Sequence, residues 1–216
     1  MAQILAKDVC AVVLAGGMGS RMGGVDKGLQ TLRGKALAHH AIDRLTHQSA
    51  GAPGQIAINA NRNALTYANW GFPVWQDDIE GFAGPLAGFA TALAHCAHPE
   101  FPYLLTVPCD SPVFPLDLLE RLSQALASNK ADIAVASAPE PNQRGETQLR
   151  TQPVFCLMRT ALLPSLNHFL TQGGRKVDAW TSQHQTVEVA FNLPHDDPQA
   201  FFNANTLAQL QSLENP

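Results

Sequence analysis

The stretch VVLAGGMGSRMGGVDKGL, which spans Val12–Leu29, joins an apolar run to a glycine-rich loop that carries cationic side chains. Glycine permits backbone conformations with positive φ and lets peptide N–H groups approach an anion that a Cβ would keep away. Arg21 and Lys27 add positive charge to the same loop. The stretch predicts a strand followed by a phosphate-binding loop. The alternative is a glycine-rich turn between a strand and a helix.

Two common phosphate-binding motifs do not fit this loop. The dinucleotide fingerprint G-x-G-x-x-G needs a third glycine, and Met22 stands at that position after Gly17 and Gly19. The nucleoside-triphosphatase motif G-x-x-x-x-G-K-[ST] needs Ser or Thr after the lysine, whereas Gly28 follows Lys27. These mismatches argue against a nicotinamide dehydrogenase and favour a triphosphate site of another kind.

Length and composition indicate one α/β domain. A chain of 216 residues with 45% hydrophobic residues can bury a substantial core, and we expect residues 1–216 to form a single domain. The net charge of −4 and the isoelectric point near 6.0 argue against nucleic acid as a partner. The sequence shows neither an apolar run of membrane-spanning length nor a secretory segment. We therefore expect a cytoplasmic protein that makes no membrane contact.

Short apolar runs alternate with helical patterns, which predicts a mostly parallel sheet covered by helices on both faces. The expected strands cover residues 9–15, 55–59, 103–107, 132–137, 154–158 and 187–191. The expected helices cover residues 38–47, 85–95, 116–128, 160–170 and 206–213. We expect Pro115 in the first turn of its helix, where a missing N–H costs little. Loops are expected at 49–54 and 139–148.

Polar residues follow several of the expected strands. Ligands of open α/β sheets bind outside the carboxyl ends of the strands, so Asn59, Asp77 and Asp110 are candidates for a site there. Asp110 stands between Pro108 and Pro112, which can hold its carboxylate rigidly for an Mg²⁺ ion on triphosphate oxygens. The structural alternatives are a cap or turn role for Asp110 and a solvated turn for Asp77.

The four cysteines are scattered among apolar neighbours and form no C-x-x-C pair. This pattern predicts buried, reduced thiols rather than disulfides. Neither the cysteines nor the histidines have a spacing that completes a zinc-ligand set.

The glycine-rich loop resembles the signature of the molybdenum cofactor guanylyltransferases, which belong to the Rossmann-like nucleotidyltransferases. The family pattern L-A-G-G-x-x-x-R-M-G-G-x-D-K-G-L matches Leu14–Leu29 at every specified position. The segment PCDSP at Pro108–Pro112 resembles the family's P-C-D-x-P magnesium motif. GPLAG at Gly84–Gly88 resembles its nucleotide-binding loop, and FNANT at Phe202–Thr206, together with the preceding Phe201, resembles its closing motif F-x-N-x-N-T.

The resemblance implies an α/β protein with a three-layer Rossmann-like nucleotidyltransferase fold and a mostly parallel central sheet. It implies transfer of GMP from GTP to the phosphate of molybdopterin that carries molybdenum, with Mg²⁺ as cofactor and pyrophosphate as the second product. Transient contacts with cofactor-biosynthesis and molybdoenzyme-maturation proteins are also implied. The alternatives are a cytidylyl- or sugar-phosphate nucleotidyltransferase, or a non-catalytic nucleotide-binding regulator.

The resemblance also indicates which side chains form the site. The catalytic candidates are Arg21, Lys27 and Asp110, and Asp110 is also the metal ligand. The nucleotide-binding candidates are Leu14, Ala15, Gly16, Gly17, Lys27, Asn59, Asp77, Gly84 and Asp110. We infer from the chemistry of guanine that Asp77 accepts its N1–H and N2–H groups, a donor pair that cytosine lacks.

The acceptor side of the site is less defined by the sequence. Its candidates, for direct contact or for support of the site, are Asn203, Asn205, Arg175 and Lys176, and Arg150 is a further basic candidate. The alternatives are local hydrogen bonding for the two asparagines and a solvated basic loop for Arg175 and Lys176.

Overall fold

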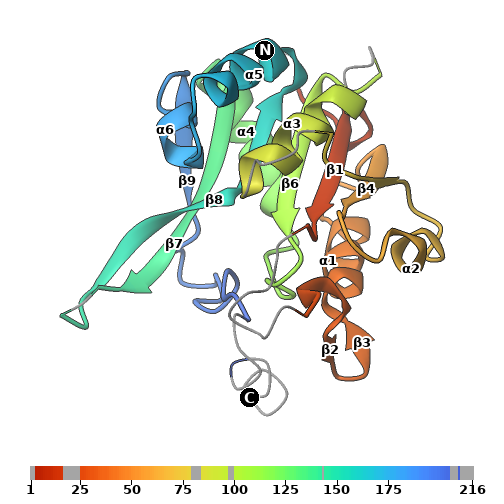
Figure 1. Cartoon of the computed structure of the whole chain (residues 1–216). Helices are drawn as coiled ribbons and strands as arrows, with labels where there is room; N and C mark the ends of the chain where they lie inside the picture. Colours follow the sequence, from red (N-terminus) through yellow and green to blue (C-terminus); the bar gives the residue numbers. More distant parts are fainter. Residues whose placement is uncertain are drawn as a thin grey trace.

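A computed structural model describes residues 3–16, 25–78, 84–96, 100–142, 144–204 and 209, and a seven-stranded sheet forms its centre (Figure 1). The strand order is β5-β4-β1-β6-β8-β7-β9. The strands are β1 (Val9–Leu14), β4 (Gln55–Asn59), β5 (Val74–Trp75), β6 (Tyr103–Pro108), β7 (Ile133–Pro141), β8 (Thr147–Arg159) and β9 (Thr186–Ala190). Only β8 runs antiparallel to its neighbours, which confirms the expected mostly parallel sheet.

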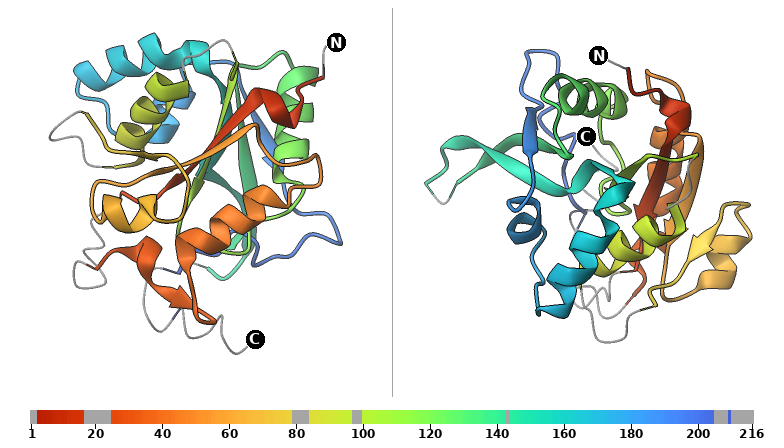
Figure 2. Two further views of the ribbon diagram at one scale, coloured as in Figure 1. Left: turned by 90° about the vertical axis from the view of Figure 1, so that its right-hand side faces the viewer. Right: turned by 90° about the horizontal axis from the view of Figure 1, so that it is seen from above.

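Helices cover both faces of the sheet, as predicted (Figure 2). One face packs against α1 (Leu37–Thr46), α2 (Ala64–Ala68) and α4 (Leu118–Ser128). The other face packs against α3 (Pro85–Cys96), α5 (Leu163–Thr171) and α6 (Val177–Thr181). Short 3₁₀ turns are η1 (Ala6–Asp8), η3 (Lys27–Leu29) and η4 (Thr160–Leu162), and β2 (Thr31–Leu32) pairs with β3 (Lys35–Ala36) in a small ribbon. Within the described ranges, no helix is both long and apolar enough to span a bilayer.

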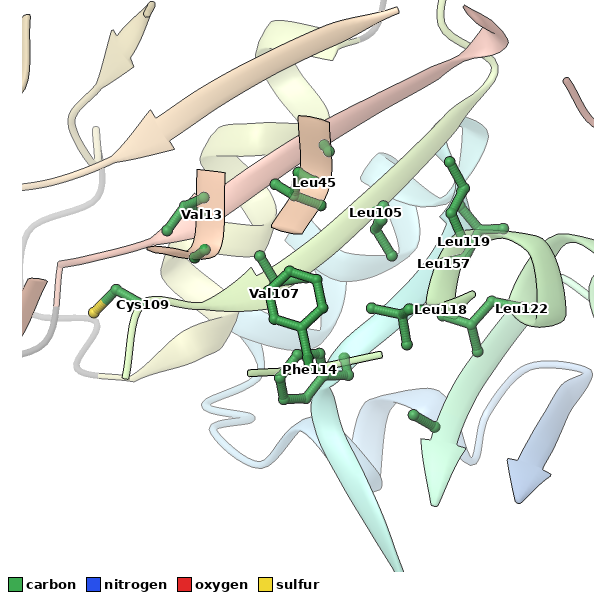
Figure 3. Close-up of a cluster of buried hydrophobic side chains, with 14 of the residues drawn as sticks. Val13, Leu45, Leu105, Val107, Cys109, Phe114, Leu118, Leu119, Leu122 and Leu157 are labelled. Atoms are coloured by element: carbon green, nitrogen blue, oxygen red, sulfur yellow. The ribbon is translucent and has the colours of Figure 1, made fainter. Parts of the chain in front are cut away.

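Burial on both faces explains why the central strands read as continuous apolar runs. In β1, Val13 contributes to the core on the α1 and α4 side, and Val12 contributes to the core on the α3 side. Figure 3 shows part of the first core, where Val13 and Val107 share one buried cluster with Leu118 of α4. A strand in this position therefore holds its carboxyl end at a fixed place in the molecule.

The loop expected at residues 139–148 was wrong. Strands β7 and β8 continue through this region as a hairpin whose register extends from Ile133 opposite Met158 to Pro141 opposite Thr147. The hairpin projects well beyond the helical layers (Figure 1). Strand β9 ends opposite Ser137, so the prolines beyond it lie where β7 pairs on one side only. Proline is tolerated in such edge positions because no ladder hydrogen bond is lost.

Other boundaries also differ from expectation. The prediction that Pro115 lies in the first helical turn was wrong, because α4 begins at Leu118. Pro115 instead precedes the helix, and its carbonyl oxygen accepts the N–H of Leu118 at 3.3 Å. The segment expected as one helix at 160–170 begins with the 3₁₀ turn η4 before α5. Almost all of the helix expected at 206–213 lies outside the described residues.

All four cysteines are buried with free thiols, which confirms the prediction of buried thiols. Burial raises the pKa of Cys109 well above its usual value. Burial also raises the pKa of Cys156, to about 12, even though a hydrogen bond with Thr106 opposes the shift. These thiols therefore remain protonated at neutral pH.

Candidate functional site

The carboxyl ends of three parallel strands lie side by side at one edge of the sheet. Leu14, the last residue of β1, is in register with Asn59 of β4 and with Pro108 of β6. After β1 the chain enters α1 on one face, and it reaches β6 through α3 on the opposite face. Open α/β sheets bind ligands at such a reversal of strand order. The predicted residues at these strand ends therefore share one location.

Lys27 and Asp110 form an ion pair at this location. The Lys27 Nζ atom lies 3.0 Å from Asp110 Oδ2, and the two side chains are only 19% and 16% exposed. Lys27 opens the turn η3 after the glycine-rich loop, and Asp110 follows β6. The topology thus brings together the cation expected to bind phosphate and the carboxylate expected to bind a metal.

Asp77 lies at the centre of a second polar cluster beyond β4 and β5. Its Oδ1 atom accepts hydrogen bonds from Asn59 Nδ2 at 2.8 Å and from Thr91 Oγ1 at 3.0 Å. Its Oδ2 atom accepts one from Asn61 Nδ2 at 2.7 Å, and its own N–H donates to Asn61 Oδ1 at 2.8 Å. Donors from β4, from the loop after β4 and from α3 therefore fix the orientation of this carboxylate before any ligand binds.

Two glycines allow the second cluster to pack closely. A Cβ on Gly88 would lie 2.6 Å from Asn59 Oδ1, so α3 approaches β4 more closely than any side chain would allow. A Cβ on Gly16 would lie 3.1 Å from Asn61 Nδ2. Gly84 precedes α3 with a φ of +118°, a conformation that favours glycine. Gly16, Gly84 and Gly88 thus each have a direct geometric reason to be glycine.

The C-terminal segment attaches to the loop that carries Asp110. The Ala204 N–H donates to the Asp110 carbonyl oxygen at 2.8 Å. The Ser111 hydroxyl donates to Asn203 Oδ1 at 2.6 Å. Asn203 therefore lies next to the predicted metal ligand and bonds to the residue that follows it, while its role in the site stays a prediction.

The basic acceptor candidates lie on other parts of the chain than Lys27 and Asp110. Arg175 is exposed, and its Nη1 donates to the carbonyl oxygens of Leu170 and Gly174 at the end of α5. Lys176 is exposed at the start of α6, and Arg150 is exposed on the hairpin. Three other predicted residues, Gly17, Arg21 and Asn205, lie outside the described residues.

Sequence reasoning missed two polar partners in the site. Thr91 is only 5% exposed. In the sequence it is a hydroxyl residue within an otherwise apolar helical segment, and that was the signal that could have identified it. Ser111 is fully buried, although it stands next to a predicted metal ligand. Buried polar groups need partners, so each pointed to a nearby acceptor.

The described residues fit one mode of magnesium binding better than another. They contain no group of three or more His, Cys, Asp or Glu side chains that could hold a metal on their own. Mg²⁺ commonly takes one or two carboxylates together with substrate phosphates and water. Asp110 at the strand end suits that arrangement.

The chain matches the family described as the MobA-like NTP transferase domain over residues 11–187. It belongs to this family. Membership makes the chain a nucleotidyltransferase rather than a dehydrogenase.

Curated MobA-like relatives resemble this chain along nearly its whole length. A molybdenum cofactor guanylyltransferase from Albidiferax ferrireducens is 58% identical over 212 residues, which cover 98% of each chain. A protein of the same name from Acidovorax ebreus is 56% identical and covers 96% of this chain and 95% of its own.

Solved structures confirm the fold. Molybdopterin-guanine dinucleotide biosynthesis protein A from Archaeoglobus fulgidus superposes with a TM-score of 0.72 at 19% identity and covers 95% of this chain and 96% of its own. A 4-diphosphocytidyl-2C-methyl-D-erythritol synthase from Anaerococcus prevotii gives a TM-score of 0.70 at 10% identity, covering 97% and 95%. Because both superpose well, the fold by itself does not select the base.

Proposed function

We propose that this chain transfers GMP from GTP to the phosphate of molybdenum-bearing molybdopterin and releases pyrophosphate. The observation that carries the proposal is the Lys27–Asp110 pair at the β1–β6 reversal. High identity to proteins named molybdenum cofactor guanylyltransferase supports the choice of substrates.

The reaction needs positioning and charge neutralisation more than proton transfer. A phosphate oxygen is already anionic near neutral pH, so the acceptor attacks the α-phosphorus without a strong general base. The bond to the β-phosphate oxygen breaks, and pyrophosphate leaves with the electron pair. Lys27 neutralises charge on the phosphates. Arg21 is assigned the same role by its place in the family motif.

The Asp110 carboxylate is the residue that would hold Mg²⁺ beside the triphosphate. The ion supplies further neutralisation of phosphate charge when it is bound. Two hydrogen bonds hold the Asp110 loop to the C-terminal segment. One joins Ser111 to Asn203, and the other joins the Ala204 N–H to the Asp110 carbonyl oxygen.

Asp77 is our candidate for base recognition. Its carboxylate is held by Asn59, Asn61 and Thr91, so it is oriented in advance. Oδ2 accepts a hydrogen bond from Asn61 and retains capacity for one guanine N–H donor. The second guanine donor would replace Asn59 or Thr91 at Oδ1. Cytosine lacks two adjacent N–H donors, so a contact with both oxygens favours GTP over CTP.

The proposal also covers the cellular setting. Free, buried thiols are typical of proteins kept under the reducing conditions of the cytoplasm, where we place the reaction. Proteins that deliver molybdopterin or receive the product would contact this chain transiently.

Thermal unfolding with Mg²⁺ and one of GTP, CTP, ATP or UTP tests the base assignment. A ligand at about 100 times its Kd adds about 2.7 kcal/mol, which corresponds to a midpoint shift of roughly 5 to 10 °C for a chain of this size. We expect this shift with GTP alone and its loss in Asp77→Ala. The variant Asp78→Ala removes the same charge one residue away and should retain the shift.

Product analysis with molybdopterin then tests the transfer itself. We expect a guanine dinucleotide and pyrophosphate in equal amounts. Equal stabilisation by all four nucleotides, or a preference for CTP, would contradict the guanylyl assignment and favour the cytidylyl or sugar-phosphate class.

A further inference from the structure

Asp26 lies beside Lys27 but points into the protein instead of toward the Lys27–Asp110 pair. The residue is 8% exposed. Its Oδ1 atom accepts hydrogen bonds from Tyr67 Oη at 2.7 Å and from Gly28 N–H at 3.1 Å. Its Oδ2 atom accepts one from Asn63 Nδ2 at 3.0 Å. A buried carboxylate with three specific donors is costly to disturb, because each donor would lose its partner.

These contacts fix the backbone on both sides of Lys27. Asp26 accepts hydrogen bonds from Tyr67 in α2 and from Asn63, which directly precedes that helix. The N–H of Gly28 donates to the same carboxylate. Lys27 therefore projects from a turn whose two flanking residues share one anchor. Its Nζ atom reaches Asp110 Oδ2 from that turn.

The anchor itself has little room to move. Tyr67 is fully buried, and its ring meets Trp70 edge-on with centroids 4.9 Å apart. Trp70 in turn stacks on His39 of α1 at 3.8 Å. A Cβ on Gly28 would lie 2.4 Å from the Tyr67 hydroxyl oxygen, so η3 is pressed against α2. The position of Lys27 is thus set by packing that extends to α1.

The charges in this arrangement are also separated. The three donors to Asp26 are neutral groups, so its carboxylate is satisfied without the ammonium of its neighbour. Lys27 is directed to Asp110, at the site where the proposed triphosphate binds. An unsatisfied Asp26 carboxylate would compete with phosphate for the same cation.

We infer that Asp26, Asn63 and Tyr67 form a positioning latch, which sets the direction of the Lys27 ammonium for the phosphates of the nucleotide. In this inference the latch residues are positioning residues that act through Lys27. The inference rests on the proposed function for its role in turnover, but the positioning of Lys27 itself does not depend on it.

The first test reads the position of Lys27 without any substrate. In protein labelled with ¹³C at the lysine ε carbons, Lys27→Met identifies the Lys27 resonance in the NMR spectrum. We expect Tyr67→Phe and Asp26→Asn to shift or broaden this resonance. The control Ser165→Ala removes a hydroxyl that contacts His184 and Trp180 on the opposite face of the sheet, and it should leave the resonance unchanged. An unchanged Lys27 resonance in folded Tyr67→Phe and Asp26→Asn would overturn the latch.

The second test uses a double-mutant cycle on GMP transfer. Loss of one hydrogen bond in Tyr67→Phe should lower kcat/KM by about two- to tenfold in the wild-type background. Because Tyr67 acts through Lys27, the same change should have an effect below about twofold in Lys27→Met. An equal loss in both backgrounds would mean that Tyr67 acts on general stability and would contradict the latch.

The two tests separate the inference from the proposed function. A Lys27 resonance that responds to Tyr67→Phe in a protein without guanylyl transfer would retain the latch and reject the function. Normal transfer with an unresponsive resonance would reject the latch and retain the function.

Discussion

The Lys27 ammonium lies 3.0 Å from the Asp110 carboxylate, although 83 residues separate the two in the chain. Each group neutralises the other, and each is also our candidate to bind one part of a metal–nucleotide complex. The triphosphate therefore competes with Asp110 for Lys27, and Mg²⁺ competes with Lys27 for Asp110. Two predictions depend directly on this relationship.

The first prediction concerns divalent metal binding to the nucleotide-free protein. Lys27→Met removes the cation next to Asp110, so the affinity for Mn²⁺, used as a probe for Mg²⁺, should rise about threefold or more, in line with the modest strength of a partly exposed pair. Titration followed by electron paramagnetic resonance measures free Mn²⁺. Lys35→Met, which removes a lysine paired with Asp43, is the matched control and should not change the affinity. An affinity that is equal in all three proteins would show that Lys27 does not compete for Asp110.

The second prediction concerns turnover. Lys27→Ala and Asp110→Ala should each lower kcat/KM by roughly 10²-fold or more, because preorganised electrostatic groups have effects of this size. Initial rates of pyrophosphate release measure the change. Asp132→Ala, which removes a carboxylate 3.8 Å from Arg159 at the far end of the sheet, should retain activity. A residue whose loss changes the rate by less than about threefold has no place in the mechanism.

The third prediction concerns the support of Asp110 by the C-terminal segment. Asn203→Ala removes the acceptor of the Ser111 hydroxyl, so the Mg²⁺ concentration for half-maximal activity should rise about two- to tenfold, as for the loss of one hydrogen bond. Ser111→Ala should have a similar effect, and the double variant should be no worse than either single variant. Asn129→Ala, at the end of α4, removes a comparable amide and serves as the control. Additive losses in the double variant would contradict a shared role.

The fourth prediction concerns alkaline pH. Burial raises the pKa of Cys156 from 9.0 to about 12 in the folded chain. Between these values only the unfolded chain loses the proton, so the free energy of unfolding should fall as pH rises above 9, by up to about 1.4 kcal/mol per pH unit from this thiol. Urea unfolding at several pH values measures the slope. Cys156→Ala should be less stable at neutral pH but should show a shallower slope above 9, and an unchanged slope would contradict the assignment.

The central strands could be predicted from sequence because buried strands have a recognisable apolar pattern. Residues 55–59 were predicted as a strand and form β4 with the same bounds. Both faces of such strands are covered, so their sequences are continuously apolar. The outer half of the β7–β8 hairpin has no such apolar pattern. Its residues from Thr147 to Arg150 are exposed, and its proline and charged residues are not typical of a strand.

The sequence named candidate site residues one by one, but it did not predict the contacts between them. Lys27 and Asp110 each stood out by their position after a strand, whereas their contact depends on β1 lying beside β6. The contact of Thr91 with Asp77 arises from the way α3 packs over the strand ends. No spacing along the chain encodes a contact of that kind. These contacts depend on packing between distant segments, which local sequence patterns do not predict.

The attachment of Ala204 to Asp110 has a consequence for protein synthesis. Once the ribosome has passed β6 and added Asp110, the nascent chain contains Lys27, Asp77 and Asp110. The sheet position next to β6 is filled by β8, and the residues that fasten the Asp110 loop are made later still. A chain that terminates before Asn203 would carry all three chemical groups without the fastening that holds them. Premature termination would therefore yield a protein whose Asp110 loop lacks both of these hydrogen bonds.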